Sequence, residues 1–127
     1  MNQGDCFFNQ PSARVPSHPW IILSYPDDYP ENVLIVNLTD AAHHHDHSCL
    51  LGPEDHPGVI VKASCVNYRD AKITSVGLLS EAFAKGLLYA KAPIPDAALD
   101  KIIDGAIETD ELTNAHRALL RRQQMVP

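Results

Sequence analysis

The sequence is short of basic residues and of cysteine, and it has no long hydrophobic segment. Its 127 residues include 10 Lys and Arg against 16 Asp and Glu, which gives a formal net charge of −6. Proteins that hold nucleic acids by bulk charge neutralise phosphates with an excess of Lys and Arg, and this chain lacks one. No run approaches the roughly 20 consecutive apolar residues of a membrane helix. The composition therefore predicts no membrane partner, and any nucleic-acid contact has to be local.

The cysteines and the first residues bear on the compartment. Cys6, Cys49 and Cys65 form an odd set without the spacing of a CxxC motif. This usage favours a reducing compartment in which the thiols act as small core side chains. Residues 1–10 carry neither the basic nor the apolar segment of a signal peptide. We therefore expect a cytoplasmic protein.

The first half of the chain has the pattern of strands. Short apolar runs rich in β-branched residues occupy 20–23, 33–38, 59–61 and 64–68, and turn residues separate them. The central runs lack a regular polar alternation, which indicates that both of their faces are covered. The sequence thus predicts a small closed β-barrel.

The second half changes to the period of helices. From Leu78 onward apolar residues recur at helical spacing, Pro95 opens a second helical segment, and a third follows. Strands followed by helices predict an α+β fold. We expect a single domain over residues 1–127, with the β-barrel in 4–75 and a helical extension in 76–127.

Four of the seven histidines lie in the segment His43-His44-His45-Asp46-His47. Clustered imidazoles are typical of metal sites. Consecutive residues of a strand point to opposite faces, however, and a polar loop makes a poor preorganised site. We therefore predict no metal ligand and no cofactor, and a metal-responsive role for this segment stays an alternative.

Two other histidines, His18 and His56, each precede a proline. The residue before proline is held in an extended conformation, which places both imidazoles at strand entrances. Loop-borne side chains at such places often carry function, and histidine suits general acid–base work near neutral pH. The alternative is a pair of hydrogen-bonded turn histidines.

Five short motifs occur in an order that resembles a known family. They are Gly4-Asp5-Cys6-Phe7-Phe8, His18-Pro19-Trp20-Ile21-Ile22-Leu23-Ser24, Val33-Leu34-Ile35-Val36-Asn37-Leu38-Thr39-Asp40, the turn Asp55-His56-Pro57 and the strand Ser64-x-Val66-x-Tyr68. Their order and spacing over residues 4–75 are similar to those of the MazF/PemK toxin ribonucleases.

The resemblance implies an SH3-like barrel of the CcdB/MazF type with helices packed against it, usually as a homodimer. Members of that family are metal-independent endoribonucleases that cut single-stranded RNA by attack of a 2′-hydroxyl on the adjacent phosphate. Each is the toxin of a type II toxin–antitoxin system, and a cognate antitoxin protein holds it inactive. Their catalytic pair is an arginine and a threonine. By position Thr39 matches the threonine, and His18 stands where the family has the arginine.

The change of arginine to histidine allows two interpretations. A histidine serves as a general base or acid, so His18 and His56, with Thr39 donating to the phosphate, would form a coherent catalytic site. We adopt this as the primary hypothesis. The alternative is that loss of the arginine leaves a non-catalytic binding module of the same fold, which inhibits a protein target or binds nucleic acid.

The side chains assigned to RNA binding are basic or aromatic. Arg69 and Lys72 are predicted to supply positive charge, and Tyr68 and Tyr25 are predicted to stack on bases. Tyr29 is a further aromatic candidate, whereas Trp20 is expected in the core. Because residues 1–74 hold most of the excess negative charge, the RNA has to be met by cations that gather locally, drawn from Arg14, Lys62, Arg69 and Lys72.

Overall fold

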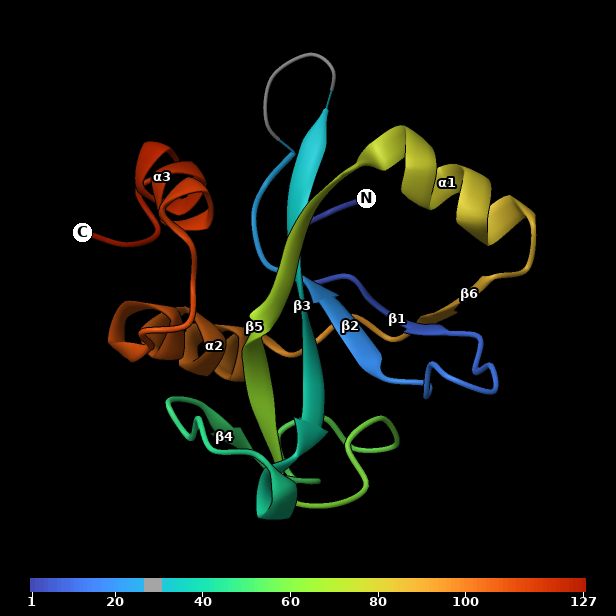
Figure 1. Cartoon of the computed structure of the whole chain (residues 1–127), viewed down its shortest axis with the longest axis horizontal. Coiled ribbons are helices and arrows are strands. Elements are labelled where there is room, and N and C mark those ends of the chain that lie inside the picture. Colours follow the sequence, from blue (N-terminus) through green and yellow to red (C-terminus); the bar gives the residue numbers. More distant parts are fainter. Residues whose placement is uncertain (27–30) are drawn as a thin grey trace.

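The computed structural model describes residues 1–26 and 31–127 and has an α+β fold (Figure 1). Six antiparallel strands form one curled sheet in the order β4-β5-β3-β2-β1-β6. The strands are β1 Cys6–Asn9, β2 Pro19–Ile22, β3 Asn32–Asp40, β4 Leu50–Leu51, β5 Ser64–Ser75 and β6 Leu88–Lys91. The helices are α1 Val76–Ala84, α2 Asp96–Glu108 and α3 Asn114–Arg122, and a short 3₁₀ turn, Ala41–His43, follows β3. The predicted α+β class is thus confirmed, and the sheet is a half-barrel where a closed barrel was predicted.

The two faces of the sheet carry separate cores. On one face, α2 and α3 pack against alternate residues of β3 such as Leu34 and Val36, with Ile102 and Leu119 among the fully buried helix residues. On the other face, α1 packs through Leu79 against a smaller cluster that includes Trp20 and Val33 together with Phe7, Ile22 and Ile35. We call these the α2/α3 face and the α1 face.

Helix α1 connects strands that lie far apart in the sheet. Ser75 caps its start, because the Ser75 hydroxyl oxygen accepts a hydrogen bond of 3.0 Å from the N–H of Leu78. The helix stops before Gly86, whose φ of +73° is a conformation that favours glycine. The chain then enters β6, which pairs with β1 at the opposite edge from β5. This strand was not predicted, because residues 76–127 were expected to be helical.

A second difference concerns the apolar run 59–61, which was predicted as a strand. It lies instead in a loop over residues 52–63. The N–H groups of Val59 and Ile60 both donate to the carbonyl oxygen of His56, which forms a turn, and Ile60 is buried. The run is apolar because it anchors the loop to the core. The stretch 27–30, which includes Tyr29, lies outside the described residues.

Within residues 1–26 and 31–127, no helix has the length and apolar character needed to cross a bilayer.

Candidate functional site

The α1 face changes from apolar to polar along β3. Val33 and Ile35 belong to the core beneath α1. The next two residues that strand alternation places on this face are Asn37 and Thr39. Asn37 is 1% exposed, a burial that an amide tolerates poorly unless it is fully hydrogen-bonded. The change to polar residues, one buried and one half-buried, marks this end of the face as the candidate site.

His18 lies beside this polar end of the sheet. Strands β2 and β3 pair with Trp20 opposite Asn37, and the same register continued by two residues sets His18 opposite Thr39. The backbone N–H of His18 donates to the Asn9 Oδ1 atom over 2.9 Å, which fixes the strand entrance. The predicted pair of His18 and Thr39 is therefore brought together.

The ring of His18 is held in one tautomer. Its Nδ1 atom lies 3.1 Å from the carbonyl oxygen of Leu38. A carbonyl oxygen only accepts, so Nδ1 carries the proton and donates it. In the neutral ring the Nε2 atom then has a free lone pair. This is the form of histidine that acts as a general base.

Two clefts meet at His18 and Pro16, which line both. The first, of about 340 Å³, also includes Thr39, Asp40 and Lys62, and we call it the Thr39 cleft. The second, of about 540 Å³, runs between the sheet and α1, and we call it the Trp20 cleft. Both volumes fall in or near the range of small-ligand sites.

The Thr39 cleft contains one ion pair. Lys62 Nζ lies 3.1 Å from Asp40 Oδ2. The N–H of Ala42, which donates to Asp40 Oδ1 over 3.0 Å, and then Lys62 lower the pKa of the Asp40 carboxyl. Asp40 is therefore ionised at neutral pH, and it offsets part of the charge that Lys62 brings to the cleft.

The Trp20 cleft is apolar on its walls and charged on one strand. Alternate residues of β5, Asp70, Lys72 and Thr74, line it, and so does Arg14. Lys72 Nζ lies 4.7 Å from the centre of the Trp20 ring, in a cation–π contact. Trp20, expected in the core, is 8% exposed and donates from Nε1 to Asn9 Oδ1 over 3.1 Å. The structure thus brings Arg14, Lys62 and Lys72 to the two clefts.

Asn37 is hydrogen-bonded to Asp70, one of the residues that line the Trp20 cleft. Its Nδ2 atom donates to Asp70 Oδ2 over 2.6 Å. Over the described part of the chain, the Oδ1 atoms of Asn37 and of its cross-strand partner Asn67 are buried without a hydrogen-bond partner. Asn37, Asp70 and Asn9 were missed by the sequence reasoning. The signal for Asn37 was present, since it interrupts the apolar run Val33–Leu38.

The structure does not bring His56 to His18 and Thr39. His56 is 4% exposed, and its Nε2 atom donates to the carbonyl oxygen of Ala92 over 2.8 Å. This hydrogen bond fastens the loop 52–63 to the segment before α2, and residues 59–62 of that loop form one wall of the Thr39 cleft. The assignment of His56 as a catalytic partner is corrected accordingly. His56 holds in place the loop that forms one wall of the Thr39 cleft.

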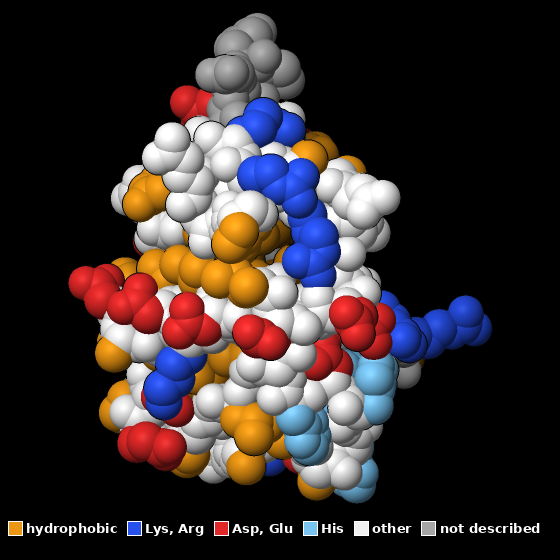
Figure 2. All heavy atoms as spheres, turned by 90° about the vertical axis from the view of Figure 1, so that its left-hand side faces the viewer, with side chains coloured by type: hydrophobic (Ala, Val, Ile, Leu, Met, Phe, Trp, Pro, Cys, Tyr) orange, Lys and Arg blue, Asp and Glu red, His pale blue; other side chains and the backbone are white. Residues whose placement is uncertain are grey.

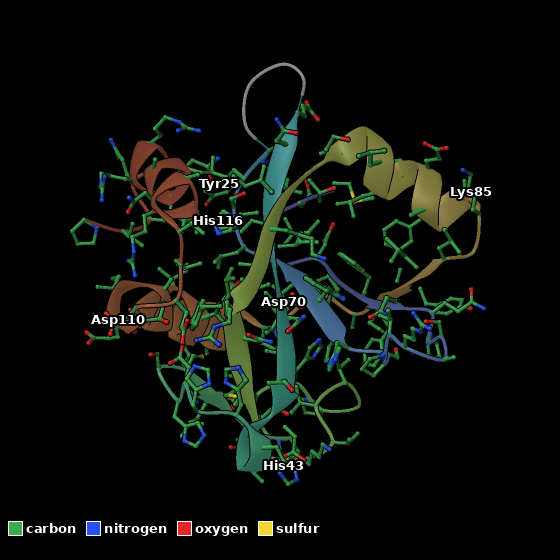
Figure 3. All side chains as sticks on the ribbon, viewed as in Figure 1. Tyr25, His43, Asp70, Lys85, Asp110 and His116 are labelled. Atoms are coloured by element: carbon green, nitrogen blue, oxygen red, sulfur yellow. The ribbon has the colours of Figure 1, made fainter. Side chains whose placement is uncertain are left out.

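Three of the four predicted substrate-binding residues also lie elsewhere. Tyr68 is 1% exposed and its hydroxyl donates to Ile102 O over 2.6 Å, so its ring cannot stack on a base. Arg69 Nε and Nη2 each lie 3.0 Å from a carboxylate oxygen of Glu111. Tyr25 lies beside α3, away from Asp70 on β5 (Figure 3). Of the four, Lys72 lines a cleft with His18.

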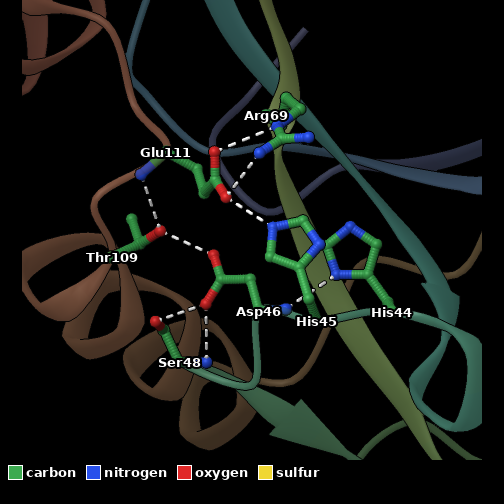
Figure 4. A network of polar contacts seen from close by, with 7 residues as sticks. All are labelled: His44, His45, Asp46, Ser48, Arg69, Thr109 and Glu111. Atoms are coloured by element: carbon green, nitrogen blue, oxygen red, sulfur yellow. Dashed lines mark hydrogen bonds and ion pairs between the residues drawn. The ribbon is translucent and has the colours of Figure 1, made fainter.

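The histidine run takes part in a polar network on the α2/α3 side (Figure 4). Glu111 accepts from Arg69 and lies 2.5 Å from His45 Nε2, and Thr109 donates to Asp46 Oδ2 over 2.6 Å. The network joins the loop after the 3₁₀ turn to the connection between α2 and α3. Among the described residues, no group of three His, Cys, Asp or Glu side chains is arranged to hold a metal ion.

A row of carboxylates lies away from the clefts, on α2. Asp96, Asp100, Asp104 and Glu108 recur every fourth residue of α2 and are exposed. Figure 2 shows the band of carboxylates that crosses this side of the molecule, with Lys and Arg gathered above it. Because α2 packs on the face opposite to α1, this negative charge lies across the sheet from His18.

The chain matches neither a family model nor a curated protein sequence.

Proposed function

We propose that this protein is a metal-independent endoribonuclease that cleaves single-stranded RNA at His18 and Thr39. The observation that carries the proposal is the 3.1 Å contact between His18 Nδ1 and Leu38 O. With the Nδ1 proton donated to Leu38 O, the Nε2 lone pair is free beside a cleft that Thr39 also lines. A base next to a hydroxyl donor is what internal cleavage of RNA requires.

The chemistry follows from these two side chains. His18 Nε2 removes the proton of a ribose 2′-hydroxyl, and the 2′ oxygen bonds to the adjacent phosphorus. The bond from phosphorus to the 5′ oxygen breaks, and that oxygen takes a proton from solvent. The products are a 2′,3′-cyclic phosphate and a 5′-hydroxyl end. Thr39 donates to a non-bridging oxygen while Lys62 adds positive charge.

Basic side chains gather at this site, three of them beside two carboxylates, Asp40 and Asp70. Arg14, Lys62 and Lys72 line the clefts that meet at His18, although the net charge is −6. Single-strand binding needs a local basic groove rather than a basic protein. The carboxylate row of α2 lies across the sheet, where screening at physiological salt weakens its repulsion.

The resemblance to MazF/PemK toxins completes the proposal. It adds an SH3-like barrel of the CcdB/MazF type as the finer description of the half-barrel, a cognate antitoxin and a second copy of the chain as partners, and a cytoplasmic location. In this proposal His18 takes the place of the arginine of that family.

The test is incubation of the purified protein with single-stranded RNA in EDTA. We expect cleavage products that end in 2′,3′-cyclic phosphate, and we expect His18→Ala to lower the rate by about 10²- to 10⁴-fold. His47→Ala is the matched control, because His47 is exposed and binds the carbonyl oxygen of Ala41. Intact RNA with the wild type contradicts the proposal.

A binding module of the same fold remains the second candidate, and one observation favours it. His56, the expected partner acid, is buried and hydrogen-bonded to the backbone. Retention of RNA by the wild type without cleavage, together with its loss in a Lys62→Ala, Lys72→Ala double variant, would support this candidate over the ribonuclease.

A further inference from the structure

The Trp20 cleft has the size and lining of a nucleotide site. Its volume of about 540 Å³ lies within the range of small-ligand sites, and apolar walls come from Trp20, Ile35 and Leu79. It opens into the Thr39 cleft at His18 and Pro16. A nucleotide in this cleft would therefore adjoin the phosphate that His18 and Thr39 address.

The polar residues of the cleft include an acceptor and a donor on one strand, beside Asn9, Arg14, His18 and Thr74. Asp70 and Lys72 lie two residues apart on β5 and both line the cleft. Asn37 fixes the Asp70 carboxylate through its 2.6 Å hydrogen bond to Oδ2, and both Oδ1 and the second lone pair of Oδ2 stay able to accept. The Lys72 ammonium stands over the Trp20 ring, 4.7 Å from its centre.

This pair of groups complements one base better than the others. The Watson–Crick edge of guanine presents the O6 acceptor next to two donors, N1–H and N2–H, so a carboxylate receives two hydrogen bonds while an ammonium donates to O6. Uracil flanks its single N–H with two carbonyl oxygens, one of which a carboxylate repels. Adenine has no ring N–H on this edge, and cytosine offers one amino group beside two acceptors.

We propose that the Trp20 cleft is a guanine subsite of the same site, in which Asp70 accepts from N1–H and N2–H and Lys72 donates to O6. Arg14, at the rim of the cleft, faces the phosphate of that nucleotide. The inference rests on the proposed ribonuclease function, and it predicts that cleavage occurs next to guanine.

The single tryptophan of the chain gives a direct test. Because Trp20 lines the cleft, its fluorescence reports a ligand there without any cleavage. We expect guanosine monophosphate to change Trp20 emission saturably, with a dissociation constant at least about tenfold lower than those of the adenosine, cytidine and uridine monophosphates. Equal response to all four nucleotides, or no response, overturns the inference.

Variants assign the recognition to the two side chains. Asp70→Asn and Lys72→Gln are each expected to weaken binding of guanosine monophosphate by about tenfold or more. Asp100→Asn is the matched control, because Asp100 is an exposed carboxylate of α2 on the other face. Circular dichroism shows whether each variant is folded. Binding that survives both substitutions in folded protein overturns the assignment.

Cleavage assays separate this inference from the proposed function. Oligonucleotides that differ by one guanine-to-adenine change are compared for cut position and rate in EDTA. Cleavage at equal rates on both, without binding of guanosine monophosphate, overturns the subsite and leaves the ribonuclease standing. Selective binding of guanosine monophosphate by a protein that leaves both RNAs intact supports the guanine site and overturns the ribonuclease.

Discussion

The two faces of the sheet differ in how the buried polar groups of their strands are paired. On the α2/α3 side, the Tyr68 hydroxyl of β5 donates to Ile102 O, and Thr109 and Asp46 are hydrogen-bonded to each other, while the unpaired buried atom among the described residues there is His116 Nδ1 on α3. On the α1 face, Asn37 is as deeply buried, yet its Oδ1 atom lacks a partner within the described residues. Satisfied polar groups stabilise a fold, whereas unsatisfied ones weaken it and are kept where they serve another purpose. On the α1 face the unpaired atoms thus belong to the sheet itself, at Asn37 and Asn67.

A pair of threonines tests this contrast most strongly. Thr39→Val removes the hydroxyl at the Thr39 cleft and is expected to lower RNA cleavage by about 10²- to 10³-fold, because one donor to the transition state is lost. Thr109→Val removes a buried hydroxyl that donates to Asp46 Oδ2, and is expected to cost about 1–3 kcal/mol of unfolding free energy.

Rate constants and urea unfolding, measured on both threonine variants, complete the comparison. The contrast fails if Thr39→Val destabilises the fold as much as Thr109→Val does. It also fails if folded Thr109→Val loses cleavage to the same extent as Thr39→Val.

A glycine on α2 probes the tight packing of the α2/α3 face. A Cβ atom at Gly105 would come within 2.6 Å of Cys49 Cβ and within 3.0 Å of the carbonyl oxygen of Ser48. Gly105→Ala is therefore expected to lower the unfolding free energy by about 1–3 kcal/mol, although alanine favours helices. Thermal unfolding measures the change. Gly77→Ala on α1, where a Cβ would lie 3.9 Å from Ser75 Oγ, is the control, and equal losses in both variants contradict the argument.

Substitution of Asn37 is expected to change the stability of the fold and the selectivity for guanine in opposite directions. Asn37→Leu keeps the side-chain size and removes an unpaired buried oxygen, so we expect unfolding free energy to stay level or to rise by up to about 1 kcal/mol. The same change frees the Asp70 carboxylate and is expected to reduce guanine selectivity. Urea unfolding and nucleotide titration measure the two effects. A loss of stability above about 2 kcal/mol would mean that Asn37 is a structural residue like those on the other face.

The smallest effect concerns pH and the network of Figure 4. The hydrogen bond with His45 and then that from Arg69 lower the pKa of the Glu111 carboxyl below its ordinary value of 4.5. A lowered folded-state pKa gives stability that is complete above the ordinary pKa and is lost as pH falls below it. Glu111→Gln should lower the melting temperature at pH 7 slightly, and the difference from wild type should shrink towards pH 3. A difference that is constant over this range contradicts the assignment.

Much of the site could be anticipated from particular residues, and some could not. The resemblance singled out His18 and Thr39, and the register of β2 with β3 explains why two residues 21 positions apart lie in one cleft. The strand at 59–61 and the roles of His56 and Tyr68 were predicted wrongly. The local sequence does not show whether a side chain faces a ligand or the core. This holds for an apolar run, for a histidine before proline and for a tyrosine in a strand.

The sequence by itself determined the α+β class and the three helical segments, because side-chain period, proline and caps act over a few residues. It also determined that any basic site has to be local, since the net charge is −6. Only the tertiary structure decided which polar side chains meet. The register of β3 with β2 places Thr39 beside His18. Helix α2 packs so that the Tyr68 hydroxyl donates to Ile102 O. Helix α1, which connects β5 to β6, forms one wall of the Trp20 cleft. These contacts join residues distant in the chain, so no local pattern encodes them.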